Sequence, residues 1–345
     1  MKILEIYRRY KKQQAYYNRD ARFIKLHNLS KITNQELTEI RQVWPMLHIR
    51  RCDLIYSMMY KQLYGFDPYF LNDFQYYQIL KKTNPHDQVV SLEHKAMADI
   101  YFHELPLPKV YLRRIAGSFY DDKMNILTFE KAIELLSTYN QFVIKPAIST
   151  GCGKGVKLVR IMPNIEKKKY IVNIVMNYGN DFVVQEVLRQ LPEMARLNPT
   201  SVNSCRITSI LINGKFGYST VLKIGKKGSE IDNWNSSYLI GVNADGTLQN
   251  FGFDHDLNKI TKTDSGFIFG GMKIPHYENM IQLVKNFHPK YFPTCGIVGW
   301  DIFIDDNENV RIIEVNLQYP GCVGEQLCSG TFFKDFRNDI CALMR

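Results

Sequence analysis

The chain has 345 residues, of which 45% are hydrophobic and 23% are charged, and its formal net charge is +10. This composition provides enough apolar side chains for two domains or one large composite domain, and it excludes a globally disordered chain. Seven cysteines without a Cys-x-x-Cys pair argue against a zinc ribbon or a disulfide framework and predict reduced thiols in a cytoplasmic protein.

Most of the positive charge belongs to residues 1–31. This segment holds nine lysines and arginines against two acidic residues, a net charge of +7. It predicts contact with an anionic polymer or with the inner face of a membrane, although a solvated helical face is the plain alternative. Nucleic acid is not the expected partner, because no nucleic-acid-binding signature accompanies the segment. The start of the chain lacks an apolar leader, and no apolar stretch approaches the ~20 residues of a membrane span.

The predicted elements change in character along the chain. Residues 1–90 indicate a mostly helical region, and a further helix is expected at 91–104 before two prolines. Beyond residue 110, strands alternate with helices, and Asn213-Gly214 and Asp245-Gly246 predict hairpin turns. Hairpins with helices between them favour an α+β fold over a doubly wound parallel sheet. The expected elements are helices at 128–136, 164–178 and 277–287, strands at 142–144, 156–161, 181–187, 205–212 and 215–222, and a final hairpin at 298–315.

A glycine-rich loop follows the strand that ends near Lys145. It is neither a Walker A loop nor a Rossmann turn, because Lys154 precedes a glycine and Val156 stands where the Rossmann pattern needs one. Since a strand follows, the pattern predicts a flap whose backbone N–H groups surround phosphate oxygens, with an ordinary glycine-rich hairpin as the alternative. The residues expected at the phosphates are Lys145, Ser149, Thr150, Gly151, Gly153 and Lys154.

The final hairpin concentrates oxygen-bearing side chains. A symmetric turn at its centre pairs Asp301 with Glu314 and Ile302 with Ile313, and Asn316 shares the face of Glu314. Two opposed carboxylates repel each other, and an all-oxygen set that resolves the conflict with a cation suits Mg2+ better than zinc. Replacing either carboxylate with its amide is therefore expected to stabilise the metal-free protein. A solvated polar hairpin is the alternative.

Between these motifs lies a set of residues that suits the rest of a nucleotide. Gln185, Glu186 and Val187 end a strand whose edge could offer backbone groups to adenine, and a nearby glutamate could accept the ribose hydroxyls. Arg206 follows on another strand, where it could face the phosphates together with Asn203. For each of these residues, an ordinary surface role is the alternative.

In this order, the motifs resemble those of ATP-grasp enzymes. In more detail, the chain from about residue 90 onward resembles the sugar-transfer-associated ATP-grasp family of bacterial polysaccharide gene clusters, through 191–206, 298–301 and 313–321. The resemblance implies two α+β subdomains, at 91–187 and 188–345, that grip ATP between antiparallel sheets, after a helical basic region at 1–90. The roles it implies are nucleotide contacts for Lys95 and Lys145, adenine for Glu186, ribose for Glu193, catalysis for Arg206 and Lys145, and Mg2+ for Asp301, Glu314 and Asn316.

The function implied by this resemblance is that of an ATP-dependent, Mg2+-requiring ligase. A carboxylate of a small molecule or glycan, such as a sugar acid, would be phosphorylated by ATP and then joined to an amine. This chemistry needs positioning and charge neutralisation rather than an enzyme nucleophile. The alternatives are a kinase that phosphorylates a hydroxyl, a ligase for peptide or protein carboxylates, and a non-catalytic module that binds nucleotide or glycan.

Overall fold

The computed structural model describes residues 21–345 except 51–52, 149–152, 164, 230–235 and 255. The first 20 residues of the basic segment therefore lie outside the described residues. By its internal contacts the chain divides into two compact units, one made of the described residues up to Lys82 together with Cys322–Arg345, and the other of Thr83–Gly321. The domain boundaries expected near residues 90 and 187 stay predictions.

The first unit is helical, as expected for the N-terminal region. Its helices include α2 (Asn34–Val43), α3 (Ile55–Tyr64), α4 (Asp73–Thr83), α11 (Val323–Ser329), η3 (Phe332–Phe336) and α12 (Arg337–Leu343). Helix α2 begins at a capping box, in which the side chains of Thr33 and Glu36 each accept a hydrogen bond from the other's backbone N–H. The buried side chain of Gln326 exchanges two hydrogen bonds with the backbone of Leu71 and so ties the C-terminal segment to this unit.

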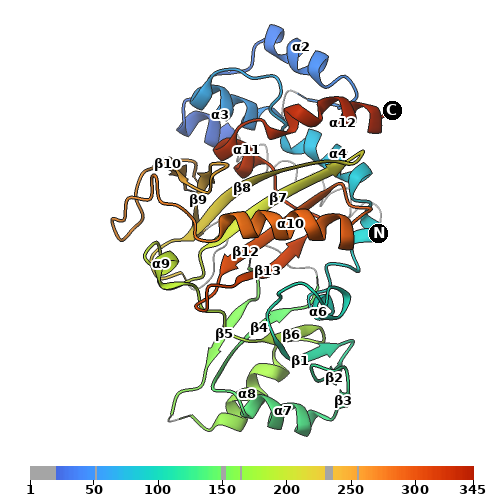
Figure 1. Ribbon diagram of the computed structural model, residues 1–345, viewed down its shortest axis with the longest axis vertical. Helices are drawn as coiled ribbons and strands as arrows, with labels where there is room; N and C mark the ends of the chain where they lie inside the picture. The colour runs from blue at the N-terminus through green and yellow to red at the C-terminus, as the bar shows by residue number, and fades with distance from the viewer. Residues whose placement is uncertain (1–20, 51–52, 149–152, 164, 230–235, 255) are drawn as a thin grey trace. The chain divides into compact units, whose positions relative to one another are not determined.

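The second unit contains two antiparallel sheets (Figure 1). The strands of the first are β1 (Val110–Ile115), β2 (Ser118–Tyr120), β3 (Ile126–Leu127), β4 (Gln141–Pro146), β5 (Lys157–Arg160) and β6 (Phe182–Gln185). The strands of the second are β7 (Ser204–Ile212), β8 (Lys215–Gly225), β9 (Ser237–Val242), β10 (Leu248–Phe253), β11 (Lys259–Ile260), β12 (Ile297–Ile304) and β13 (Val310–Asn316). Their orders are β3-β2-β1-β6-β4-β5 and β11-β10-β9-β8-β7-β12-β13, which confirms the α+β prediction.

Helices cover one face of each sheet. The first sheet packs against α7 (Phe129–Ser137), which is capped by Thr128, and α8 (Lys167–Met176), while α10 (Tyr277–Tyr291) packs on the second. Short helices α5 (His86–Val89), α6 (Ala98–Tyr101) and α9 (Pro192–Ala195) lie in the connections. The turn predicted at Asn213-Gly214 joins β7 to β8, with φ angles of 52° and 75° that suit these two residue types.

The helix expected at 91–104 is wrong for most of its length, since only α6 is helical there. The reason is that the segment before α6 is held by long-range hydrogen bonds, one of which takes the backbone N–H of Lys95 away from a helical partner. The backbone N–H of Lys95 donates to the carbonyl of Ala147, 2.9 Å away, and the carboxylate of Glu93 accepts hydrogen bonds from the backbone of Leu317 and Gln318. The segment thus links the end of β4 to the end of β13.

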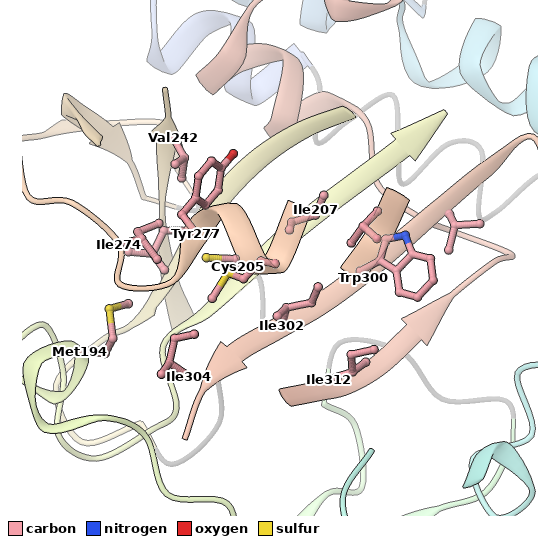
Figure 2. Close-up of a cluster of buried hydrophobic side chains, with 14 of the residues drawn as sticks. Met194, Cys205, Ile207, Val242, Ile274, Tyr277, Trp300, Ile302, Ile304 and Ile312 are labelled. Atoms are coloured by element: carbon pink, nitrogen blue, oxygen red, sulfur yellow. The ribbon is translucent and has the colours of Figure 1, made fainter. Parts of the chain in front are cut away.

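One face of the second sheet is covered by the apolar core, and the opposite face carries polar side chains of β7 and β12. Figure 2 shows Trp300, Ile302 and Ile304 of β12 together with Cys205 and Ile207 of β7 in one apolar cluster, which also contains residues of α10. Successive side chains of a strand point to opposite faces of its sheet. The residues between these core positions, 301 and 206, therefore project from the face opposite the apolar cluster.

A chain of buried hydrogen bonds fixes this core beside position 301. The indole N–H of Trp300 donates to Ser209 Oγ at 2.9 Å, and Ser209 Oγ lies 2.7 Å from Nδ1 of His288. The other ring nitrogen of His288 lies 2.8 Å from the carbonyl oxygen of Cys295. Burial lowers the pKa of His288 to about 4, although its bond to Cys295 opposes the shift. The ring is therefore neutral at physiological pH, with Nδ1 accepting and Nε2 donating.

The buried neutral His288 predicts a loss of stability in acid. Because its folded pKa lies below the unfolded value of 6.5, its contribution is present above pH 6.5 and is lost as the pH falls toward 4. The loss should amount to about 3 kcal/mol from this group. Urea unfolding at several pH values should show a smaller acid dependence for His288→Gln than for the wild type, while replacement of the exposed His103 with Gln changes nothing. An identical acid dependence in His288→Gln would contradict the prediction.

Candidate functional site

Asp301 is the centre of a buried ionic cluster. The guanidinium of Arg206, directly opposite on β7, donates to both carboxylate oxygens of Asp301 at 2.7 and 2.9 Å. The ammonium of Lys223 on β8 lies 2.9 Å from Asp301 Oδ1. Burial alone would raise the pKa of Asp301, but the two cations outweigh it and hold the pKa well below its usual value. The structure therefore corrects the expected repulsion around Asp301, because its nearest charged partners are cations.

Lys223 was missed at the level of sequence. Its neighbours on β8 carry no motif, and its role depends on the pairing of three strands that are far apart in the sequence. The register pairs Arg206 with both Val221 and Asp301, which brings β8 and β12 to the two sides of β7. A lysine two residues beyond Val221 shares its face of the strand and reaches the same carboxylate.

The β12–β13 hairpin contains a β-bulge, where its register shifts between Asp301 and Ile302. Asp301 pairs with Glu314 as predicted, but Ile302 pairs with Ile312 instead of Ile313. The register shift leaves Ile313 as an extra residue on β13. A β-bulge of this kind redirects the side chains that follow it, and bulges are enriched beside active sites.

The bulge places Glu314 and Asn316 on the same face as Asp301. Before the bulge, Ile312 belongs to the apolar cluster, and after it Val315 and Leu317 pack there. Uninterrupted alternation from Ile312 would have turned Glu314 into this core. Instead, the side-chain amide of Asn316 donates to Asp301 Oδ2 at 3.3 Å, which leaves its amide oxygen as the group available to face a cation.

Two lysines approach Glu314, one from the segment before α6 and one from the first sheet. The ammonium of Lys95 lies 3.6 Å from Glu314 Oε2, and its backbone is fixed by the bond to Ala147 described above. Lys145 on β4 is 8% exposed. Burial lowers the pKa of Lys145 to about 8, while Glu314 raises it and Lys95 lowers it further. The predicted nucleotide lysines and one predicted metal ligand are therefore brought together.

Glu186 and Gln185 lie at the junction of the two sheets. A carboxylate oxygen of Glu186 accepts from the backbone N–H of Lys109 at 2.8 Å and from the guanidinium of Arg311 on β13 at 2.6 Å. The backbone N–H of Glu186 donates to the carbonyl of Lys109. Gln185 is buried at the end of β6, where it pairs with β1 on one side and β4 on the other. Val187 comes directly after Glu186 in the chain. This arrangement holds the expected adenine hinge in place between the sheets.

Other predicted residues lie in different surroundings. Glu193 is exposed in the first turn of α9. The start of α9 lies close to the turn of the β12–β13 hairpin, because the backbone N–H of Leu191 donates to the carbonyl oxygen of Ile304. Asn203 is buried, and its side-chain amide donates to Gln190, Met194 and Asn198 of the preceding linker. Asn203 therefore holds the linker instead of facing the phosphates with Arg206.

The flap is only partly within the described residues. Ser149, Thr150 and Gly151 lie outside them. Gly153 and Lys154 lie in a turn, in which Val156 N–H donates to the carbonyl of Gly153, and Lys154 is exposed. Their phosphate contacts stay predictions.

The oxygen donors of the site differ in how accessible they are to a hard cation. Glu314 is partly exposed and Asn316 offers an amide oxygen, whereas the oxygens of Asp301 already accept from Arg206 and Lys223. Among the described residues, no group of three or more His, Cys, Asp or Glu side chains could hold a metal. Two carboxylates with an amide suit Mg2+, which typically combines one or two carboxylates with substrate phosphates. The residue types of the set therefore suit Mg2+, and Glu314 and Asn316 have the oxygens that are accessible to it, whereas both oxygens of Asp301 are bound by Arg206, Lys223 and Asn316.

The charges on this face suit an anionic ligand. Within the described part of the chain, four cations surround two carboxylates, which leaves a positive excess. Desolvated cations bind phosphate and carboxylate groups more strongly than exposed ones do. The cations are Lys95, Lys145, Arg206 and Lys223, and the carboxylates are Asp301 and Glu314.

Two further observations bear on chemistry and location. The cysteines in the described ranges are free and buried, and burial raises the pKa of Cys205 to about 12, so this thiol is not a nucleophile at neutral pH.

No helix among the described residues combines the length and apolar character that a membrane span requires.

The chain resembles one protein family in sequence and several solved structures in fold. A family model described as sugar-transfer associated ATP-grasp matches residues 75–342. No curated protein matches the chain. Among solved structures, D-alanyl-alanine synthetase A of Vibrio cholerae is 10% identical, with 74% of this chain and 65% of that chain covered and a TM-score of 0.43. N5-carboxyaminoimidazole synthetase of Staphylococcus aureus, complexed with ADP, is 12% identical, with coverage of 72% and 52% and a TM-score of 0.41. The chain thus spans less than two thirds of the length of either protein.

Proposed function

Because the chain belongs to the sugar-transfer associated ATP-grasp family, we propose that it is an ATP-dependent ligase that joins a carboxylate to an amine. The observation that carries the proposal is the cation-rich site itself, where Lys95 of the segment before α6 and Lys145 of the first sheet meet Glu314 of the second sheet. Such a site accommodates a polyphosphate through charge neutralisation.

The reaction proceeds in two balanced steps. A carboxylate oxygen of the substrate attacks the γ-phosphorus of ATP, the bond to the β-phosphate oxygen breaks, and ADP leaves. The amine then attacks the carbonyl carbon of the acyl phosphate, the C–O bond to phosphate breaks, and the amine loses a proton as the amide forms. Both steps transfer groups between substrates, so the task of the protein is to position them and neutralise charge.

The site residues divide this task. Lys145 and Lys95 bind the phosphate chain from the side of the first sheet. Arg206 holds the transferring phosphoryl group or the substrate carboxylate, and Asp301 fixes the plane of its guanidinium through two hydrogen bonds. Glu314 and Asn316, together with Asp301, would hold Mg2+, which when bound neutralises phosphate oxygens during transfer.

The substrate class and the setting of the reaction belong to the same proposal. The description of the family as associated with sugar transfer supports a sugar acid as the carboxylate, in the synthesis of a surface polysaccharide or its precursor. The reduced thiols and the requirement for ATP suit the cytoplasm. The basic segment at 1–31 would bring the enzyme to an anionic polymer or to the inner face of the membrane.

The identity of the product tests this proposal. Purified protein is incubated with Mg2+, ATP, a panel of uronic acids and an amine such as glycine or hydroxylamine. The expected products are an amide or hydroxamate, ADP and free phosphate in equal amounts, formed only when the carboxylate is present. A stable phosphoester without free phosphate would replace the ligase with a hydroxyl kinase.

A further inference from the structure

The loop from Leu317 to Pro320, directly after β13, is fixed at its beginning. The carboxylate of Glu93 accepts hydrogen bonds from the backbone N–H groups of Leu317 and Gln318 and from the side-chain amide of Gln318. Leu317 itself is buried in the apolar cluster of the second sheet. Three hydrogen bonds to one carboxylate leave this part of the loop little conformational freedom.

The same loop is fixed at its end, against the site. The carbonyl oxygen of Pro320 accepts from Arg206 Nη1 at 3.1 Å and from Thr208 Oγ1 at 3.3 Å. Pro320 also packs directly on β12. A Cβ atom at Gly299 of this strand would lie 2.5 Å from the carbonyl oxygen of Pro320. Glycine at 299 therefore lets the loop lie on the site face, two residues from Asp301.

Tyr319 lies between these two anchors and is nevertheless 71% exposed. When a ligand packs on an aromatic side chain whose backbone is already tethered, only the side-chain torsions remain to be ordered, which lowers the entropic cost of binding. Exposed aromatic rings beside a set of converging polar groups are typical of ligand sites. Here the polar group is the guanidinium of Arg206, which donates to the carbonyl oxygen of Pro320, the residue after Tyr319, and which a carboxylate would meet.

We propose that Tyr319 is the platform for the carboxylate substrate, which is a cyclic sugar acid. The apolar face of the pyranose ring would lie on the tyrosine ring, and the carboxylate would point toward Arg206. A planar aromatic face paired with a cation selects a ligand that is apolar on one face and anionic at one end. This inference rests on the proposed function and adds the residue that selects a ring-shaped acid over an open-chain one.

Calorimetric titration of the full chain with two probes tests the inference. The probes are D-glucuronate, which is cyclic, and D-gluconate, an open-chain sugar acid that also has six carbons, each in the presence of Mg2+ and ADP. Tyr319→Ala should weaken glucuronate binding by about tenfold or more and leave gluconate binding unchanged. Tyr319→Phe should retain glucuronate binding within about twofold, because the ring face and not the hydroxyl makes the contact. Tyr77→Ala, at an exposed tyrosine on α4, is the matched control.

The outcomes separate this inference from the proposed function. ADP affinity measured on the same samples should be equal in all variants, and failure of the wild type to bind ADP would overturn the proposed function. With ADP binding intact, equal glucuronate affinity in the wild type and Tyr319→Ala would overturn the platform. The platform would also be overturned if the wild type did not bind glucuronate, or if Tyr319→Ala lost gluconate binding in parallel with glucuronate binding.

Discussion

Asp301→Asn is expected to lower ATP turnover by about a hundredfold or more and to destabilise the protein at the same time. Turnover falls because Arg206 loses the charge that orients it and because a donor for Mg2+ becomes neutral. Stability falls because Arg206 and Lys223, both largely buried, lose the anion that neutralises them. Breaking a buried ion pair from one side costs about 3 kcal/mol. Steady-state kinetics and urea unfolding of the same preparation measure both effects.

Glu314→Gln separates the two effects. Glu314 is partly exposed, and its ammonium partner Lys95 lies 3.6 Å away, so the amide should cost little stability while turnover falls as in Asp301→Asn. Asp306→Asn, in the exposed turn of the same hairpin, is the control and should match the wild type in both assays. An Asp301→Asn protein with wild-type stability would contradict the ionic cluster, and wild-type turnover in both site variants would contradict the site.

The lowered pKa of Lys145 leads us to expect that the affinity for ATP depends on pH. Its pKa of about 8 means that its ammonium is present below pH 8 and is lost as the pH rises above it. A polyphosphate binds the charged form, so the dissociation constant for ATP should rise by up to about tenfold per pH unit above pH 8. Calorimetry near pH 8.5, in buffers with different ionisation enthalpies, should show proton uptake when ATP binds.

Two variants isolate the effect of this lysine. Lys145→Arg keeps its charge across the range and should bind ATP without the pH dependence. Lys145→Ala should bind ATP at least tenfold more weakly at pH 7 and should also lack the dependence. A wild-type affinity that is flat between pH 8 and 10, or a slope that persists in Lys145→Ala, would contradict the position of Lys145 beside the phosphates.

Much of the fold was predictable because local sequence rules operate where contacts are local. The turn at Asn213-Gly214 and the cap at Thr128 both follow from the preferences of single residues. The segment at 91–104 was predicted less well, since only α6 is helical there. Glu93 and Lys95 make bonds with residues far along the chain, and no helical pattern reveals such partners.

The site shows a different limit of sequence reasoning. The pairing of Asp301 with Glu314 was predicted from a symmetric turn, but the actual turn pairs Ile304 with Val310, and the bulge at Ile313 then restores the expected partners. Two departures from the assumed geometry thus offset each other. A bulge changes the alternation of a strand without a signal in its residue types, so only the structure explains why Glu314 faces the site.

The transfer of oxygen from the substrate carboxylate to phosphate tests the central claim most directly. In the proposed reaction one carboxylate oxygen bridges carbon and phosphorus in the acyl phosphate, and it leaves with the phosphate when the amine attacks. A uronic acid labelled with oxygen-18 in its carboxylate should therefore give phosphate that carries one labelled oxygen per amide formed, in step with ADP. Unlabelled phosphate accompanying the product would contradict the account, because the oxygen would then have come from water.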